Sequence, residues 1–259
     1  MKYKIILFFL LTSCINNTYV GKSEYVYSAK GFAKIKNQHS SDSGNNFYVF
    51  HNKLKLGTKI RITNPTNGKS LEKIIKKKVN YLDENSLEIA AKDIECKLDM
   101  IIVASGALDN PEKSIKNLSA DKFIKMFEAN TLPTALISKY FLPLLYKDRI
   151  TKFTALSARV GSIEDNQLGG WYSYRASKAA LNMILKNLSI EQRRLNPNSI
   201  IFGLHPGTVD TPLSQPFQKQ GKEYFTPEFA AKKLKYVIES KTTNDNGKIF
   251  AWDNKLIPS

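Results

Sequence analysis

Residues 157–191 read SARVGSIEDNQLGGWYSYRASKAALNMILKNLSIE, and this stretch decides the fold. It contains Tyr174 and Lys178, which are four residues apart and share one face if the segment is a helix. An ammonium group beside a phenol favours the phenolate, so we expect Lys178 to lower the pKa of Tyr174. With 12 tyrosines in the chain, this spacing arises by chance roughly once or twice. The order of the surrounding elements must therefore decide whether the pair is functional.

Strands and helices alternate on both sides of this stretch. Short apolar runs at 99–104, 153–156, 200–204 and 248–252 are typical of buried strands, and 86–94, 174–194 and 226–240 have the character of helices. Ser119 is a suitable cap for another helix, which Pro133 must bend or split. This alternation predicts an α/β fold with a parallel sheet.

The ordered motifs of residues 81–259 resemble the C-terminal two-thirds of a short-chain dehydrogenase/reductase of the C-factor type. The resemblance implies an oxidoreductase that uses NAD or NADP on a small carbonyl or alcohol. It gives Tyr174 the role of general acid and base. Lys178 would tune the pKa of Tyr174 and hold the nicotinamide ribose, and Asn130 would organise the proton relay. The resemblance implies these cofactor-binding residues: Ser105, Gly106, Ala107, Lys178, Pro206, Gly207, Thr208 and Thr211.

Two departures from that family pattern stand out. The substrate-orienting serine is replaced by Ala158, which leaves Ser157 and Ser162 as candidates for its hydroxyl. The thirteen glycines include no pair separated by two, so the Gly-rich phosphate-binding motif is absent. We therefore expect a truncated Rossmann-like sheet, weak or absent cofactor binding and an impaired or inactive enzyme. The strand at 99–104 would then be an exposed edge prone to self-association.

The N-terminus has the pattern of an export signal. Lys2 and Lys4 precede the apolar run 5–11, which is too short to span a bilayer. The following Leu11-Thr12-Ser13-Cys14 resembles a bacterial lipobox. Residues 1–14 are thus predicted to be a lipoprotein signal peptide with lipidation at Cys14, which implies an envelope protein anchored to the membrane. The alternative is a buried N-terminal strand with a chance cysteine, in a cytoplasmic protein.

The formal charge of +16 is concentrated near the N-terminus. Residues 1–80 contain 15 basic and 3 acidic side chains, a net +12. Residues 15–80 are predicted to be a basic β-rich segment: 15–46 has the composition of a tether and loops, 59–63 alternates like a strand, and turn residues at 65–68 lead to a possible return strand at 71–79. His51 to Ser70 resembles the start of the rare lipoprotein A family, with His51 at the position of its active-site histidine.

That second resemblance implies binding of cell-wall glycan or an anionic envelope surface through residues 47–80. Lys76, Lys77 and Lys78 stand where the acidic partner of His51 belongs, so we expect no lytic activity. The alternatives are a structural His51 and a solvated lysine face. The charge break motivates the hypothesis that two gene remnants join near residue 80.

Composition argues against two other classes of function. The lysines are not interleaved with an aromatic platform and form no recognised reading motif, so no specific nucleic acid is expected. The three histidines and two cysteines have no zinc-ligand spacing, so no metal site is predicted.

Overall fold

The computed structural model describes residues 79–211, 213–218 and 224–259 in full, and the backbone of four strands at 5–11, 48–51, 59–63 and 70–74. Cys14, residues 15–47 and Lys76 to Lys78 lie outside the described residues, and so do the predictions made for them. Of His51, only the backbone is described.

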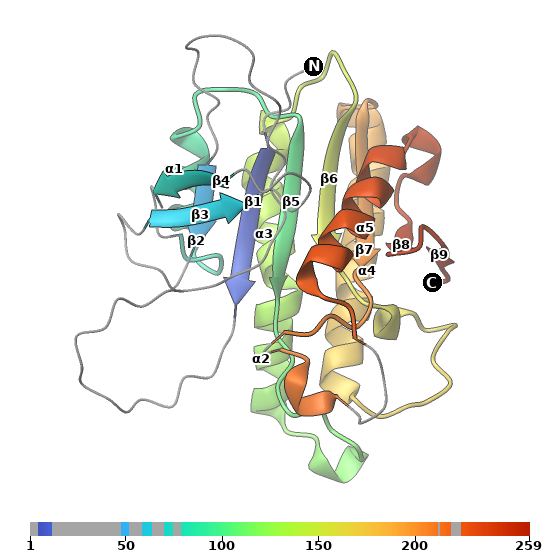
Figure 1. Cartoon of the computed structure of the whole chain (residues 1–259). Coiled ribbons are helices and arrows are strands. Elements are labelled where there is room, and N and C mark those ends of the chain that lie inside the picture. The colour runs from blue at the N-terminus through green and yellow to red at the C-terminus, as the bar shows by residue number, and fades with distance from the viewer. Residues whose placement is uncertain are drawn as a thin grey trace, which may run out of the picture.

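A seven-stranded sheet organises the fold (Figure 1), in the order β2-β1-β5-β6-β7-β8-β9. All neighbouring strands run parallel except β8 and β9. A separate antiparallel hairpin joins β3 to β4, as the alternation and turn residues of that segment predict. The strands are β1 (Ile5–Leu11), β2 (Tyr48–His51), β3 (Lys59–Thr63), β4 (Ser70–Ile74), β5 (Met100–Gly106), β6 (Thr151–Leu156), β7 (Ser199–His205), β8 (Ile249–Ala251) and β9 (Leu256–Ile257).

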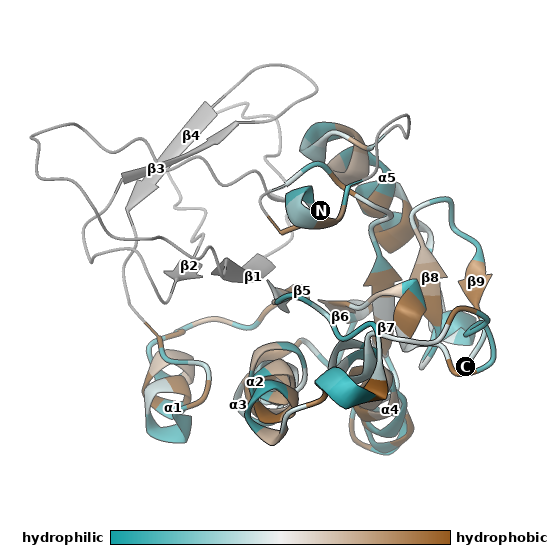
Figure 2. Cartoon of the chain, turned by 90° about the horizontal axis from the view of Figure 1, so that it is seen from below, coloured by the Kyte–Doolittle hydropathy of each residue, from teal (hydrophilic) through white to brown (hydrophobic). Residues whose placement is uncertain are grey.

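Helices cover both faces of the sheet (Figure 2). The helices labelled α1, α2, α3 and α4 lie on one face, and α5 lies on the other. The α-helices are α1 (Glu84–Lys92), α2 (Ala120–Asn130), α3 (Leu132–Phe141), α4 (Tyr172–Leu195) and α5 (Pro227–Ser240). Short 3-10 turns are η1 (Ile115–Asn117), η2 (Leu142–Leu144), η3 (Arg159–Gly161), η4 (Gln215–Phe217) and η5 (Thr243–Asp245).

The central strands are apolar along their length because both of their faces are buried. On β7, Ile201 packs in the core that includes Leu181 of α4. Its neighbour Phe202 points to the opposite face and packs in the core with Leu234 of α5. Successive side chains of a strand alternate between faces, so one strand anchors both helical layers.

The predicted helix starts at Ser119 and Thr226 are confirmed, whereas the helix predicted at 86–94 lies two residues earlier, at Glu84–Lys92. The Ser119 side chain caps α2 by accepting a hydrogen bond from Lys122 N, and Thr226 caps α5 by accepting one from Phe229 N. Pro133 lies at the start of α3 and separates it from α2, because proline fits the first turn of a helix and disrupts its interior.

The predicted exposed edge at 99–104 is wrong. β1 pairs with β5 from Ile5↔Met100 to Leu11↔Gly106, and β2 pairs with the other side of β1. The apolar run 5–11 thus supplies the parallel neighbour that β5 was expected to lack. The backbone groups of β5 are used within the chain, which removes the basis for self-association through that edge.

No helix in the described part of the chain is long and apolar enough to cross a membrane.

Candidate active site

The candidate site lies where β5 and β6 end and α4 begins (Figure 1). In an open parallel sheet, the loops at the carboxyl ends of the strands form the ligand-binding crevice. The predicted residues reach this place from separate elements. Gly106 ends β5, Asn130 ends α2, and Tyr174 and Lys178 occupy the first two turns of α4.

Lys178 is directed into the fold. Its side chain is buried, and Nζ donates a hydrogen bond of 2.9 Å to the carbonyl oxygen of Leu156 at the end of β6. Nζ also lies 5.9 Å from the centre of the Tyr174 ring. The predicted pair therefore shares one face of α4, as the spacing of four residues implies.

Burial dominates the protonation of both groups. It raises the pKa of Tyr174 to about 12 and lowers the pKa of Lys178 to about 8. The expectation that Lys178 lowers the pKa of Tyr174 is therefore wrong for this structure. Removal of water disfavours the charged form of each group, and this effect exceeds their mutual attraction. Tyr174 is a neutral phenol near pH 7.

Asn130 links the end of β5 to α4. Its Nδ2 donates to Ala107 O at 3.0 Å and to Ser177 Oγ at 3.1 Å, and its Oδ1 accepts from Ala107 N at 2.8 Å. Ser177 Oγ in turn donates to the carbonyl oxygen of Tyr174 at 2.8 Å. The buried amide of Asn130 thus fixes both the loop after β5 and the turn of α4 that carries Tyr174.

Gly106 allows these groups to approach one another. A Cβ atom at this position would lie 3.2 Å from Asn130 Oδ1 and 3.3 Å from Lys178 Nζ. The predicted residues Gly106, Asn130 and Lys178 are therefore in one cluster. Ser105 is buried beside it in the sequence, and its Oγ has no hydrogen-bond partner among the described residues.

The loop after β6 contains no serine hydroxyl directed to Tyr174. Ser157 Oγ donates to Asn182 Oδ1 at 2.5 Å. Ser162 Oγ accepts from Asp165 N at 3.0 Å and donates to Ser259 O at 3.4 Å. Both candidate hydroxyls are thus engaged elsewhere, while the buried Ala158 remains at the expected serine position.

The same loop packs very closely on α4. A Cβ atom on Gly161 would lie 2.8 Å from the carbonyl carbon of Lys178, so this position accepts only glycine without displacement of the helix. Asn182 Nδ2 donates to Gly161 O at 3.2 Å and adds a second tie.

The predicted residues after β7 form a separate set of contacts. Gly207 has a φ of +77°, and a Cβ atom there would lie 2.6 Å from the Phe225 ring. Thr208 O accepts from Phe225 N at 3.0 Å, and Thr211 N donates to Ser214 Oγ at 3.2 Å. Gly207 and Thr208 thus hold the loop against Phe225, and the described contacts do not join it to Asn130 or Lys178.

His205 ends β7 and was not predicted as a site residue. Burial lowers its pKa to about 4, and the charge of Arg159 acts in the same direction. His205 is therefore neutral near pH 7.

Sequence reasoning missed Ser177, Glu112 and Trp171. Ser177 precedes Lys178 and joins Asn130 to Tyr174. Glu112 is buried and contacts the first turn of α4. Trp171 has a left-handed backbone with a φ of 53°. Trp171 and Ser177 lie beside Tyr174 and Lys178 in the sequence, and this proximity was the only signal. The contacts of Ser177 with Asn130 and of Glu112 with Ser173 join distant segments and leave no pattern in the sequence.

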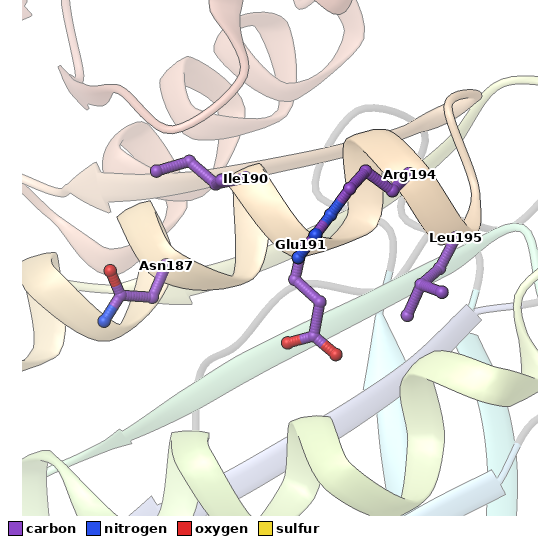
Figure 3. Close-up of a pocket in the computed structure, with 5 residues that line it drawn as sticks. All are labelled: Asn187, Ile190, Glu191, Arg194 and Leu195. Atoms are coloured by element: carbon purple, nitrogen blue, oxygen red, sulfur yellow. The ribbon is translucent and has the colours of Figure 1, made fainter.

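A shallow pocket lies far from this site (Figure 3). It is on the outer side of the last turns of α4, and its nearest residue, Asn187, follows Tyr174 by about 20 Å of helix. Its distance from Tyr174, Lys178 and Asn130 excludes it from their chemistry. It is lined by Asn187, Ile190, Glu191, Arg194 and Leu195.

Comparison with solved structures supports the fold. NADPH-bound carbonyl reductase from chicken fatty liver superposes with a TM-score of 0.64 at 24% identity, covering 71% of this chain and 77% of that protein. Carbonyl reductase Sniffer of D. melanogaster gives a TM-score of 0.63 at 21% identity, covering 71% and 78%. At these identities, the likeness establishes the architecture alone.

Sequence comparisons identify the family. A dehydrogenase of Rhodococcus sp. (strain AD45), 1-hydroxy-2-glutathionyl-2-methyl-3-butene dehydrogenase, is 32% identical over 173 residues, which cover 66% of this chain and 74% of that protein. The C-signal protein of Myxococcus xanthus is 34% identical over 93 residues, covering 36% and 54%. These comparisons give no support to the resemblance between His51 to Ser70 and the rare lipoprotein A family. The model of the short chain dehydrogenase family matches residues 67–222, and the chain belongs to this family of NAD(P)-dependent oxidoreductases.

Proposed function

We propose that this chain reduces a small carbonyl compound, or oxidises the corresponding alcohol, with a weakly bound NAD(P) cofactor. The observation that carries this proposal is the cluster that Gly106 forms with the buried Asn130 and Lys178 beside Tyr174. Three separate elements, β5, α2 and α4, converge on this one cluster, which a structural role for any single residue would not require. The carbonyl reductases of matching architecture support a carbonyl substrate.

The described residues fit the nicotinamide-ribose end of such a cofactor. Lys178 Nζ is a donor, and Gly106 lacks the Cβ atom that would crowd it. The buried Ser105 Oγ has an unused hydrogen-bonding capacity among the described residues. The NADPH-bound chicken reductase makes NADPH the first cofactor to test. The segment that would face the pyrophosphate, between β1 and β2, lies outside the described residues.

Tyr174 is suited to proton donation. The bound nicotinamide would supply or accept the hydride. With a pKa raised to about 12 by burial, Tyr174 remains protonated at neutral pH and can give its phenolic proton to the carbonyl oxygen of a substrate. A carbonyl oxygen that gains negative charge makes this transfer progressively more favourable. In the direction of alcohol oxidation, Tyr174 would have to accept the proton as a phenolate, a form that its raised pKa disfavours at neutral pH.

Lys178 and Asn130 support that proton transfer in different ways. The Lys178 ammonium, 5.9 Å from the Tyr174 ring centre, would stabilise the phenolate left behind. Asn130 holds Ala107 and Ser177, and Ser177 holds the Tyr174 backbone. The phenol is therefore held in place before the substrate arrives, which lowers the entropic part of the barrier.

The absent Gly-rich motif sets the expected affinity. Without a glycine turn at a helix N-terminus, the pyrophosphate loses its usual backbone donors. We expect NADPH to bind with a Kd of about 1 mM or weaker, which corresponds to about 4 kcal/mol. Fluorescence titration with NADPH and with NADH measures this affinity directly.

The titration and a turnover assay test the two parts of this proposal. Micromolar binding of either cofactor would contradict the expected weak cofactor binding. Absence of cofactor-dependent turnover with every member of a panel of aldehydes, ketones and α-dicarbonyls, at cofactor concentrations of about 10 mM, would contradict the catalytic proposal. Lys178→Met is the matched control, because it removes the ribose-side donor and leaves the fold of α4 in place.

Export as a lipoprotein is a second proposal for the N-terminus. It rests on Lys2 and Lys4, the apolar run 5–11 and the lipobox-like segment ending at Cys14. The two uses of residues 5–11 exclude each other, because cleavage before Cys14 would remove β1 from the sheet. Labelling with a radioactive fatty acid, lost in Cys14→Ala, would support export, whereas an unlabelled cytosolic chain would contradict it. Glycan binding by residues 47–80 stays a prediction without support from the comparisons.

A further inference from the structure

We propose that Glu112 is a positioning residue, which caps the catalytic helix α4 from a neighbouring loop and thereby fixes Trp171 and Tyr174. This role rests on the proposed function, because it matters for catalysis only if Tyr174 is the proton donor. Glu112 itself lies in the loop between β5 and α2, about 60 residues before α4 in the chain.

The first turn of α4 has no cap of its own. Trp171 occupies the cap position, but its side chain forms no capping hydrogen bond. Its backbone lies in the left-handed region, with a φ of 53°, which costs energy for a residue with a Cβ atom. Helix N-termini leave backbone N–H groups without partners inside the helix. This start of α4 therefore needs partners from elsewhere.

Glu112 supplies those partners with three hydrogen bonds. Ser173 Oγ donates to Glu112 Oε1 at 2.6 Å, and Ser173 N donates to Glu112 Oε2 at 3.3 Å. Trp171 N donates to the backbone oxygen of Glu112 at 2.5 Å. One residue thus holds both sides of the turn that precedes Tyr174.

The surroundings of Glu112 favour its charged form at this place. Its side chain is only 2% exposed. This burial acts to raise its pKa, but the hydrogen bonds from Ser173 and the charge of Lys122 outweigh it and leave the pKa below the usual value. A carboxylate at a helix N-terminus also interacts favourably with the helix dipole. The two hydrogen bonds from Ser173 help to keep this buried carboxylate charged, because an unpaired buried charge would be strongly unfavourable.

Displacement of this turn would move the groups around the substrate position. Tyr174 directly follows Ser173, and the Trp171 ring lies edge-on to the Tyr174 ring with centres 6.1 Å apart. Trp171 also contacts Phe217, with ring centres 5.8 Å apart, and so connects this turn to the loop after β7. A shift of about 1 Å in a reacting group can reduce a rate by about a hundredfold.

The structure offers a local probe of this turn that does not depend on activity. The chain has two tryptophans, so Trp252→Phe leaves Trp171 as the single tryptophan, whose fluorescence can be excited selectively over that of tyrosine. In that background, acrylamide quenching of Trp171 should increase about twofold or more for Glu112→Ala, because the freed turn opens locally. Glu112→Gln should quench like the parent protein. Its amide can accept from Ser173 N and donate to Ser173 Oγ, and so retains both contacts without charge.

Kinetics test the consequence for catalysis. With NADPH and butane-2,3-dione as probes, Glu112→Ala should lower kcat about tenfold or more and change KM for the dione much less. Glu112→Gln should recover most of kcat. Ser173→Ala should lower kcat less than Glu112→Ala. The double variant should add little to Glu112→Ala, because the two residues act through one contact.

These measurements separate the two proposals. Equal quenching of Trp171 in the parent and in Glu112→Ala would overturn the positioning role of Glu112. Failure of Glu112→Gln to quench like the parent would overturn it as well. If the parent protein has no reductase activity with any probe carbonyl, the proposed function is overturned. The quenching comparison still decides whether Glu112 fixes Trp171.

Discussion

The loop after β5 and the loop after β6 flank the same phenol, but they differ in what they retain. The loop after β5 keeps its relay, since Asn130 binds both the backbone of Ala107 and the side chain of Ser177. The loop after β6 keeps its close packing at Gly161 but has Ala158 in place of the expected hydroxyl. Both loops thus keep the contacts that support the backbone, while the loop after β6 lacks the side-chain hydroxyl. If Tyr174 is the proton donor, as proposed, this difference predicts that the donor is held in place while one contact to the substrate is lacking.

The largest expected effect comes from replacing Tyr174, the phenol on α4 that both loops flank. Tyr174→Phe removes the phenolic proton and keeps the ring contact with Trp171. Reduction of a probe carbonyl should slow about a thousandfold, since general acid catalysis contributes on this scale. The measurement is kcat with NADPH at saturating carbonyl, with unchanged circular dichroism as the control for folding. A loss of less than about tenfold would show that Tyr174 is not the proton donor.

The second prediction concerns the free energy of unfolding, which the buried ammonium group of Lys178 lowers. Its pKa in the folded cofactor-free protein is about 8, below the ordinary 10.5. Below pH 8 the folded protein must keep a buried ammonium, so this group lowers stability there. Between pH 8 and about 10 the folded state has released the proton and the unfolded state has not, so stability rises with pH.

Lys178→Met isolates this contribution. At pH 7 the variant should unfold with a free energy about 2 kcal/mol higher than the parent, after allowance for the lost bond to Leu156 O. The difference should shrink as pH rises from 8 to 10, as measured by urea unfolding. Above pH 10 the raised pKa of Tyr174 acts in the opposite direction, so the comparison ends there. A pH-independent difference would refute the lowered pKa of Lys178.

Sequence reasoning reached the fold and the pair of Tyr174 and Lys178 because their signals are local, whereas Gly106 and Asn130 followed only from the family resemblance. The apolar runs predicted β5, β6 and β7, and the spacing of Tyr174 and Lys178 placed them on one face of α4. It could not give the direction of the Tyr174 pKa shift, which depends on burial by segments far away in the chain. Glu112 was invisible for the same reason. A lone glutamate in a polar loop shows no pattern until the fold brings it to Ser173.

The pairing of β1 with β5 was also missed as a main prediction. The apolar run 5–11 supports both a signal sequence and a buried strand, since each requires only consecutive apolar residues. Composition cannot separate them, because the difference lies in what the run contacts.

The smallest effect should come from restoring the side-chain chemistry of the loop after β6. Ala158→Ser places a hydroxyl at the end of β6, at the position where the family has its substrate-orienting serine. Ala158 is buried, and a serine adds one oxygen atom to its side chain. Stabilisation of the developing oxyanion by one more donor should raise kcat about tenfold, less than the usual contribution of a preorganised donor. Ser157→Ala is the matched control, since Ser157 Oγ is engaged by Asn182 and its loss should leave kcat within about twofold. If Ala158→Ser gives no increase while Tyr174→Phe abolishes activity, the two loops do not divide the chemistry in this way, and the substrate is oriented from the side of β5.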